Sequence, residues 1–305
     1  MGIYAASMLT DLQRADGKAS APPGSLVMRR ERRYLPRMQL TPVSRRSPLS
    51  LDDRSAGRPD ALPDADALKK ETKALLNRLG ELQATLYADK RYAVLVVLQA
   101  RDAAGKDGTV RKVFGAFNPS GCSVTSFRVP TPLELEHDYL WRVHNAVPPR
   151  GMIGIFNRSH YEDVLVVRVR GLQPKEVWSK RYEQINAFEH MLDDNRVKIL
   201  KFFLHVSRDE QAERMRDRLS DPTENWKFRV GDLEDRALWD EYTKAYRDAL
   251  RLCSTPWAPW YFVPADDKKA RNYYIARTVV DTLEGLALKY PRADRKVLKL
   301  KRTLK

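Results

Sequence analysis

Residues 92–109 of the chain read YAVLVVLQARDAAGKDGT, and this stretch decides the fold. Its first part, Tyr92–Leu98, is a short continuous apolar run, which is typical of a strand buried on both faces of a parallel sheet. The Gly-Lys turn that follows leads into a helix that we expect to run through Phe117. A helix that begins directly after such a strand presents its backbone N–H groups to phosphate oxygens. The stretch therefore predicts a phosphate-binding loop that includes Gly105, Lys106, Gly108 and Thr109.

The loop departs from the usual phosphate-loop pattern at two positions. That pattern is Gly-x-x-x-x-Gly-Lys-Ser/Thr, whereas Ala100 takes the place of the first Gly and Asp107 that of the Ser/Thr. On spacing alone, a charged strand-to-helix turn that binds no ligand is an alternative. Asp102 and Asp107 flank Lys106, and carboxylates repel phosphates unless metal ions lie between them. We therefore expect more than one Mg²⁺, with Mn²⁺ as an alternative, bridging a highly charged phosphate chain to these carboxylates.

Strands and helices alternate along the rest of the chain. Besides Tyr92–Leu98, strands are expected at Ser123–Val129, Met152–Phe156, Val197–Val206 and Trp260–Pro264. Helices are expected at Ala65–Ala88, Leu133–Ala146, Arg208–Leu219, Leu233–Cys253 and Asn272–Leu288. The run Val164–Val169 is open between a strand and a buried helix. This alternation is typical of a three-layer α/β fold, with a mostly parallel five-stranded sheet and helices on both faces.

Three polar clusters directly follow predicted strands: the Gly105 loop, Asn157-Arg158 and Arg208. Because ligands bind at the carboxyl ends of parallel strands, we expect these clusters to form one site. Glu162, five residues after Asn157, is either a functional carboxylate or one that interacts only with a helix dipole. For the arginines of the following helix, the alternative is a solvated face with exposed ion pairs of little energetic worth. These arginines are Arg208, Arg214 and Arg218.

The net charge of +15 lies mostly at the two ends of the chain. Residues 1–60 carry eleven basic and six acidic side chains, and residues 286–305 carry eight and one, so that only +3 remains between them. We expect residues 1–60 to be a disordered leader, because such a composition cannot bury enough apolar surface to fold. The functional domain is expected over 61–288, followed by a basic tail over 289–305. Such tails are usually solvated, so no specific nucleic-acid partner is expected.

Neither end of the chain contains an apolar run of membrane-spanning length or the apolar core of a signal peptide. We therefore expect a cytoplasmic protein without membrane contact. The two cysteines, Cys122 and Cys253, do not have the spacing of metal ligands, and we expect them to be small buried hydrophobic residues.

The stretch Gln99–Thr109 resembles the P-loop of the polyphosphate kinase 2 family. Further stretches are similar to the same family, in the same order along the chain. They are Ala116–Pro119 with Gly121, His137–Arg142, Gly154–Val164, Trp226–Phe228 and Gly231–Leu233. The resemblance covers roughly Leu68 to Leu288 and leaves out the leader and the basic tail.

The resemblance implies a fold similar to that of thymidylate kinases, with a P-loop core and a helical lid over roughly 208–232. It implies Mg²⁺-dependent, reversible transfer of the terminal phosphoryl group of inorganic polyphosphate to a nucleotide. The acceptors implied are nucleoside mono- and diphosphates: AMP, ADP and GDP. The family tends to form dimers or tetramers, so a homo-oligomer is expected.

Roles follow from the matching motifs. Asp102 and Glu162 would hold metal or orient the acceptor, Asp107 would be a metal or acceptor-side carboxylate, and Lys106 would bind phosphate. Arg158 would clamp the transferring or acceptor phosphate. The lid arginines Arg208, Arg214 and Arg218 would reach the polyphosphate chain, while Phe117, Asn118 and Asn157 would contact the nucleotide.

Asn157 indicates a subclass. Other branches of the family have Asp at this position, and the Asn-Arg-Ser form resembles the one-domain class III branch, which accepts both mono- and diphosphates. An Asn carries no negative charge, so Glu162 or a water would take over toward the metal. Two other readings stay open: a nucleotide kinase with ATP as donor, and a polyanion-binding protein that acts through its basic ends.

Overall fold

The computed structural model describes residues 39–46, 49–300 and 303. Its centre is a five-stranded sheet with the order β2-β3-β1-β4-β5, and all four strand pairs are parallel. The strands are β1 (Ala93–Ala100), β2 (Cys122–Ser126), β3 (Ile153–Asn157), β4 (Val197–His205) and β5 (Trp260–Pro264). The predicted α/β fold with a five-stranded sheet is confirmed.

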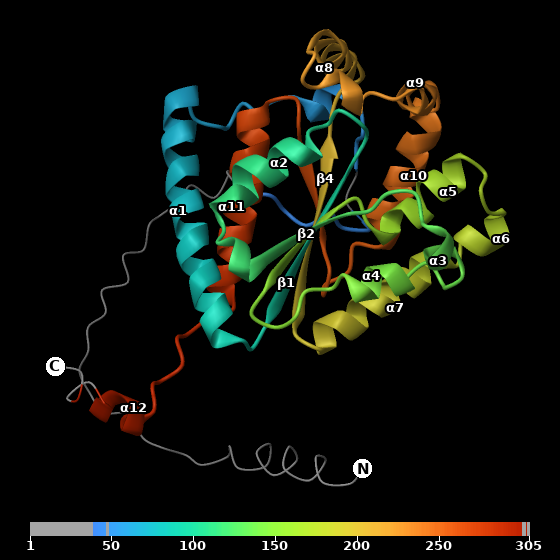
Figure 1. Ribbon diagram of the computed structural model, residues 1–305. Coiled ribbons are helices and arrows are strands. Elements are labelled where there is room, and N and C mark those ends of the chain that lie inside the picture. Colours follow the sequence, from blue (N-terminus) through green and yellow to red (C-terminus); the bar gives the residue numbers. More distant parts are fainter. Residues whose placement is uncertain (1–38, 47–48, 301–302, 304–305) are drawn as a thin grey trace. The chain divides into compact units, whose positions relative to one another are not determined.

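Helices cover both faces of the sheet (Figure 1). One face is covered by α1 (Ala65–Asp89), α2 (Lys106–Val113) and α11 (Lys268–Gly285), and the other by α5 (Val166–Val169), α7 (Arg181–Asp194) and α10 (Trp239–Leu252). The short helices α3 (Pro132–Leu135), α4 (Trp141–Asn145) and α6 (Lys175–Trp178) connect elements of the second face. The remaining helices are α8 (Arg208–Ser220), α9 (Val230–Ala237) and α12 (Arg295–Leu300).

The central position of β1 explains its apolar sequence. All eight of its residues are buried, since β3 pairs on one side and β4 on the other. Successive side chains of a strand point to opposite faces. Val94 and Val96 accordingly belong to the core beneath α1 and α11, whereas Leu95 and Val97 belong to the core beneath α7 and α10.

The register brings the polar segments after three strands to one edge. Leu98 of β1 pairs with Asn157, the last residue of β3, and Ala100 at the end of β1 pairs with Leu204 near the end of β4. The loop after β1, the turn after β3 and the start of α8 therefore emerge next to one another. Helices α8 and α9 stand above this edge, where the helical lid was expected (Figure 1).

Two long helices of the sequence-based prediction are wrong. The segment predicted as Leu133–Ala146 forms α3 and α4, separated where Asp138 accepts a hydrogen bond from the Leu140 N–H through its side chain. The segment predicted as Leu233–Cys253 forms α9 and α10, which meet at Leu238 with ψ of 30°. The ambiguous run after Val164 is helical, in α5.

Part of the expected leader packs onto the domain, which differs from the prediction of disorder over 1–60. The Val43 N–H donates to Trp260 O at 2.8 Å, and Pro42 forms an antiparallel bridge with Tyr261. A short 3₁₀ helix, η2 (Asp53–Ala56), follows, and Leu51 is buried. The physical reason is that β5 is an edge strand with unpaired backbone groups, which this segment partly satisfies. Residues 1–38 lie outside the described residues.

Among the described helices, none has both the length and the apolar character that crossing a membrane requires.

Candidate active site

The loop after β1 needs glycine at position 105. Gly105 has φ of 100°, a left-handed conformation that L-residues with a side chain rarely adopt. A Cβ atom at this position would also lie 1.9 Å from Nη1 of Arg271, which donates to the carbonyl of Ala104 from below the loop. Ala103 likewise has a positive φ of 61°. The chain therefore turns sharply between β1 and α2, and the first backbone N–H groups of α2 have no acceptor within the helix.

Lys106, the first residue of α2, folds its side chain back over the loop. Its Nζ donates to Ala100 O at 2.9 Å and to Arg101 O at 3.3 Å. Burial and then the charge of Arg158 lower the pKa of Lys106, to about 8, against the opposite effect of Asp102 and Glu162. A phosphate oxygen would favour the charged lysine.

Arg158 joins the turn after β3 to the loop after β1. Its Nη2 lies 2.5 Å from Oδ1 of Asp102, and its Nη1 lies 3.6 Å from Oε2 of Glu162. The Arg158 N–H donates to Leu98 O at 3.0 Å. The residue has φ of 64°, which costs an L-residue about 1–2 kcal/mol. Strain of this kind persists where the surrounding structure holds a functional group in place.

The charges around Asp102 keep it ionised. Burial acts to raise the pKa of this carboxyl group. The positive charges of Lys106, Arg158 and Arg218 together outweigh burial, so the pKa of Asp102 lies below its ordinary value. Glu162 also accepts a hydrogen bond from Gln99 Nε2 at 3.1 Å. Four of the predicted catalytic residues, Asp102, Lys106, Arg158 and Glu162, thus meet at one edge of the sheet.

Asp107 stands apart from the other two predicted metal ligands. It lies in the first turn of α2 and accepts a hydrogen bond from Asn157 Nδ2 at 2.6 Å. Over the described part of the chain, no three or more His, Cys, Asp or Glu side chains form a group that could hold a metal ion. The expected cluster of Asp102, Asp107 and Glu162 is therefore not assembled by protein atoms alone. Asp102 and Glu162 still fit Mg²⁺, which proteins often bind through one or two carboxylates together with substrate phosphates.

The three lid arginines have different surroundings. Arg208 is exposed, and its guanidinium lies 5.9 Å from the ring centroid of Trp239. Arg218 is half-buried and close enough to Asp102 to help lower the pKa of that carboxyl group. Arg208 thus lies beside an aromatic residue of α10, and Arg218 lies near Asp102.

Arg214 differs from the expectation that it reaches polyphosphate. Its side chain is buried, and its Nε donates to Glu210 at 2.7 Å. Its Nη1 donates to the carbonyls of Ala103 and Ala104, and its Nη2 to those of Ala265 and Asp266. All five N–H donors of a guanidinium are thus occupied. Arg214 supports the phosphate loop from behind and has no donor left for a ligand.

Phe117 and Asn118 also differ from their expected role in nucleotide binding. Phe117 is buried in the core, with its ring centroid 5.7 Å from that of Phe114. Asn118 exchanges hydrogen bonds with Gln83 through its backbone, and its side chain accepts from the Ser120 N–H. The physical reason is that α2 runs away from the phosphate loop. The residues after α2 therefore lie near the start of β2, at the amino ends of the strands, and the phosphate loop lies at their carboxyl ends.

An aromatic wall from α10 completes the cleft beside Arg158 and was missed by the sequence analysis. Trp239, Tyr242 and Tyr246 line this cleft together with Arg101 and Gln211. Arg101 lies over the Trp239 ring at 4.0 Å and donates to Trp239 O at 3.1 Å. The spacing of the three aromatic residues places them on one helix face, which would have been the available signal. Such a face usually indicates core packing.

Comparison with known proteins places these features in a family. The sequence profile of the polyphosphate kinase 2 family matches residues 63–291. The chain is 58% identical over 225 residues to the AMP/ADP-polyphosphate phosphotransferase of Meiothermus ruber, covering 73% of this chain and 84% of that protein. It is 46% identical over 228 residues to the ADP-polyphosphate phosphotransferase of Rhodopseudomonas palustris, covering 71% and 79% respectively.

A solved structure agrees. The polyphosphate kinase 2 of Arthrobacter aurescens matches with a TM-score of 0.79 at 40% identity, covering 82% of this chain and 90% of that one. The resemblance that the P-loop and its companion motifs indicated is confirmed, as is the P-loop kinase-like fold. From its sequence, its parallel sheet and the side chains gathered at the carboxyl ends of β1 and β3, the chain belongs to the polyphosphate kinase 2 family.

Proposed function

We propose that the protein transfers the terminal phosphoryl group of inorganic polyphosphate to a nucleoside mono- or diphosphate. The observation that supports this best is the meeting of Lys106 and Arg158 with two carboxylates, Asp102 and Glu162, at the carboxyl ends of β1 and β3. Relatives named as AMP/ADP- and ADP-polyphosphate phosphotransferases share this part of the chain.

Lys106 and the start of α2 would bind the phosphate groups. The Lys106 ammonium now donates to two carbonyls of its own loop, so a phosphate oxygen that enters the loop takes over these donors. Arg158 faces the same loop and would stabilise the negative charge that develops on the transferring phosphoryl group.

The transfer balances without a further reactant. A terminal phosphate oxygen of the nucleotide attacks the terminal phosphorus of polyphosphate in line with the bond that breaks. The polyphosphate chain leaves one phosphate shorter, and its bridging oxygen keeps the bonding electron pair. One phosphoanhydride bond is broken and one is formed, so we propose that the reaction is reversible.

Mg²⁺ is the proposed metal, with Mn²⁺ as a substitute. Asp102 and Glu162 would hold it together with phosphate oxygens, and Asp107 would act as a separate carboxylate on the acceptor side. When bound, the ion would neutralise charge on the phosphate groups.

We propose AMP and ADP as acceptors, with GDP as a further one. The support is Asn157, whose neutral amide donates to Asp107. With Asn at this position, the end of β3 carries less negative charge toward the acceptor phosphate than it would with a second carboxylate. Arg208 and Arg218 of α8 would bind the polyphosphate chain, and the support is that Arg208 lies beside Trp239 and that Arg218 helps to lower the pKa of Asp102.

A panel of acceptors with long-chain polyphosphate as donor tests the function. We expect AMP, ADP and GDP to yield ADP, ATP and GTP in the presence of Mg²⁺, and excess product to drive the reverse reaction. Lys106→Ala should remove turnover and leave the fold intact, with the exposed Lys112→Ala as the control. Phosphorylation of nucleotides with ATP alone as donor would show a different kinase and overturn the proposal.

Quaternary structure and location form part of the same proposal. We propose a homodimer or homotetramer, which the exposed apolar side chains of Val129, Leu133 and Leu135 support, and light scattering on the eluting protein would measure its mass. We propose a cytoplasmic location, in line with two free cysteines. Fractionation of cells would test it.

A further inference from the structure

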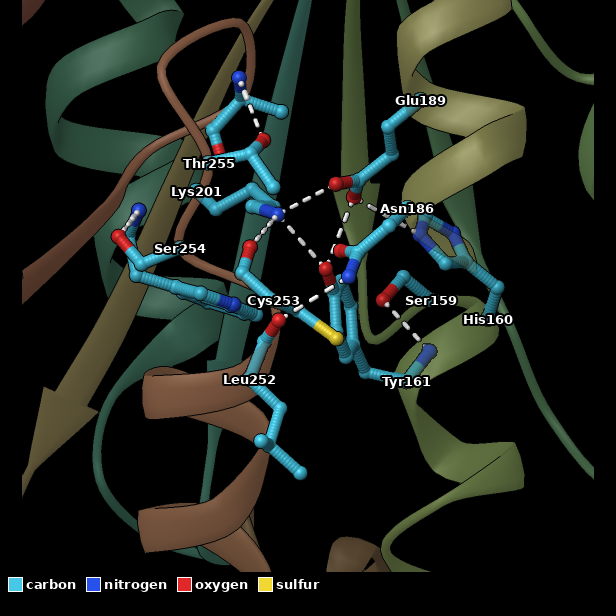
Figure 2. A network of polar contacts seen from close by, with 12 residues as sticks. Ser159, His160, Tyr161, Asn186, Glu189, Lys201, Leu252, Cys253, Ser254 and Thr255 are labelled. Carbon is cyan, nitrogen blue, oxygen red and sulfur yellow. Dashed lines mark hydrogen bonds and ion pairs between the residues drawn. The ribbon is translucent and has the colours of Figure 1, made fainter. Parts of the chain in front are cut away.

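A fully buried polar network includes two side chains of the turn after β3, His160 and Tyr161 (Figure 2). Its centre is the ammonium of Lys201 in β4, which donates to Glu189 Oε2 at 2.5 Å, Tyr161 Oη at 2.7 Å and Cys253 O at 2.7 Å. A lysine ammonium has three donors, and all three are used. The Tyr161 hydroxyl in turn donates to Glu189 Oε1 at 3.0 Å.

His160 is the fourth side chain of this network. Its Nε2 lies 3.2 Å from Glu189 Oε1. An ionised carboxylate only accepts hydrogen bonds, which assigns the proton to Nε2 of the imidazole. The side chains of His160, Glu189 and Lys201 are at most 1% exposed. Glu189, on α7, thus accepts hydrogen bonds from Lys201 of β4 and from His160 and Tyr161 of the turn after β3.

The network and the candidate active site share one short segment of chain. His160 and Tyr161 open the 3₁₀ helix η5 (His160–Asp163), directly between Arg158 and Glu162. The side chains of His160 and Tyr161 are buried in the core, while Arg158 contacts Asp102 of the phosphate loop and Glu162 contacts Arg158 and Gln99. Figure 2 shows Ser159, His160 and Tyr161 approaching Glu189 and Lys201 from one side. A shift of this turn relative to β4 would displace Arg158.

Arg158 needs such support. Its left-handed backbone is strained, and its own main-chain tie to β1 is the N–H bond to Leu98 O. Rotation at Arg158 would relieve the strain and move the guanidinium away from Asp102. Two side chains anchored two and three residues further along the turn oppose that rotation.

We propose that Lys201, Glu189, His160 and Tyr161 form a positioning network that holds the Arg158–Glu162 turn in register with the phosphate loop. The inference rests on the proposed phosphotransfer, since it assigns Arg158 to the reacting phosphates. These four residues touch no substrate themselves. They act through Arg158 and Glu162.

Stability alone is a weak reason for such a network. Replacing a buried ion pair by apolar side chains of similar volume is often neutral or stabilising, whereas removal of one partner leaves an uncompensated buried charge. A core between β4 and α7 could therefore be apolar. What an apolar core would lack is the directional pair of hydrogen bonds from His160 and Tyr161 to Glu189.

Tyr161→Phe tests the proposal with the loss of one oxygen atom. The ring keeps its packing against Trp260, so the variant should fold, but the turn loses the two bonds of the Tyr161 hydroxyl, to Glu189 and Lys201, and keeps only the bond from His160 to Glu189. We expect kcat to fall about tenfold with the KM for polyphosphate unchanged, because Arg158 is displaced while phosphate binding to Lys106 persists. Hydrogen exchange at the Arg158 N–H should become faster, a readout independent of activity.

Tyr182→Phe is the matched control. Tyr182 is also buried and loses one side-chain hydrogen bond, to Arg168, but it lies on α7 outside the network. Its kcat should match that of the wild type. A kcat of Tyr161→Phe within about twofold of the wild type, an effect on KM alone, or equal losses in both variants would overturn the positioning role. An inactive wild-type protein would instead refute the proposed function, and the exchange measurement would still test the network.

A double variant, Glu189→Leu with Lys201→Met, separates positioning from charge compensation. Removal of both charges should cost less stability than removal of either one, since no buried charge is left uncompensated, although His160, Tyr161 and the Cys253 carbonyl lose partners. We expect its kcat to stay at least as low as that of Tyr161→Phe, because His160 and Tyr161 have lost their acceptor. Wild-type kcat in a folded double variant would contradict the proposal.

Discussion

The side-chain amide of Asn157 donates to Asp107 Oδ1 at 2.6 Å and so joins the end of β3 to the first turn of α2. Asn157→Asp would replace this hydrogen bond by two carboxylates in contact. Two carboxyl groups that share one site have one pKa raised, so the folded variant binds a proton more tightly than the unfolded chain. Its stability should therefore recover as the pH falls from 8 to 5, by about 1 kcal/mol.

Thermal unfolding across this pH range, with and without Mg²⁺, measures the effect. Asn157→Ala is the control, since it loses the hydrogen bond without adding a charge and should show the pH profile of the wild type. Mg²⁺ should restore the Asp variant at pH 8, because a bound cation would offset the repulsion between the two carboxylates. An Asp variant with an unchanged pH profile would contradict the contact.

The lowered pKa of Lys106 should make both the stability of the protein and its activity depend on pH. Its pKa is lowered from 10.5 to about 8, so the folded protein holds this proton less tightly than the unfolded chain does. Below pH 8 the buried charge therefore reduces stability, and this cost disappears as the pH rises from 8 to 10.5. Because the charged form binds phosphate, kcat/KM for polyphosphate should fall above a pH of about 8.

The profile of kcat/KM against pH, compared with that of Lys106→Arg, checks this assignment. Arginine stays protonated throughout, so kcat/KM of the variant should no longer fall above a pH of about 8, even if its rate is lower. Persistence of the same fall in Lys106→Arg would assign it to another group.

Alanine variants at Arg214 and Arg218 should have different effects, one on the stability of the fold and the other on polyphosphate binding. Arg214→Ala removes the donor to the carbonyls of Ala103, Ala265 and Asp266 and one of two donors to that of Ala104, and it should cost about 2–4 kcal/mol of stability. Arg218→Ala should leave the stability unchanged and raise the KM for polyphosphate. Urea unfolding and initial rates measure the two effects, and Arg216→Ala, at an exposed position of the same helix, is the control. Equal stability of the Arg214 and Arg216 variants would contradict the supporting role.

Leu51 tests the packing of the segment before α1. Its side chain is 6% exposed within the core beneath α7 and α10. Leu51→Ala should cost about 2–4 kcal/mol through the lost burial and the cavity left behind. Leu252→Ala, at a position that is 41% exposed, should cost far less in the same unfolding experiment. Similar losses for both variants would show that the segment does not pack as described.

Local pattern was enough for the centre of the fold. The apolar run Tyr92–Leu98 could be recognised as a buried strand, because a strand covered on both faces forms a continuous run of apolar residues. The glycine at 105 marked the sharp turn into α2, since other residues are strained there. The alternation of strands and helices predicted the parallel sheet, and hence that the segments after β1 and β3 would meet.

The division of the helices could not be predicted in the same way. The apolar spacing of α9 continues into α10, so periodicity alone predicts one helix where the chain bends at Leu238. Trp239 and Tyr242 likewise follow a pattern common to core helices. Only the approach of α10 to Arg101 turns that face into a wall of the cleft.

The sequence by itself determined the phosphate loop, the succession of strands and helices along the chain, and the family. Each of these can be recognised from the types and spacing of neighbouring residues in the chain. The tertiary structure alone decided the role of each side chain. Arg214 and Arg218 are four residues apart on one helix, yet only Arg214 is buried against the carbonyls of Ala103 and Ala104. The physical reason is that donors and acceptors far apart in the chain are matched only when α8 packs onto the loop after β1.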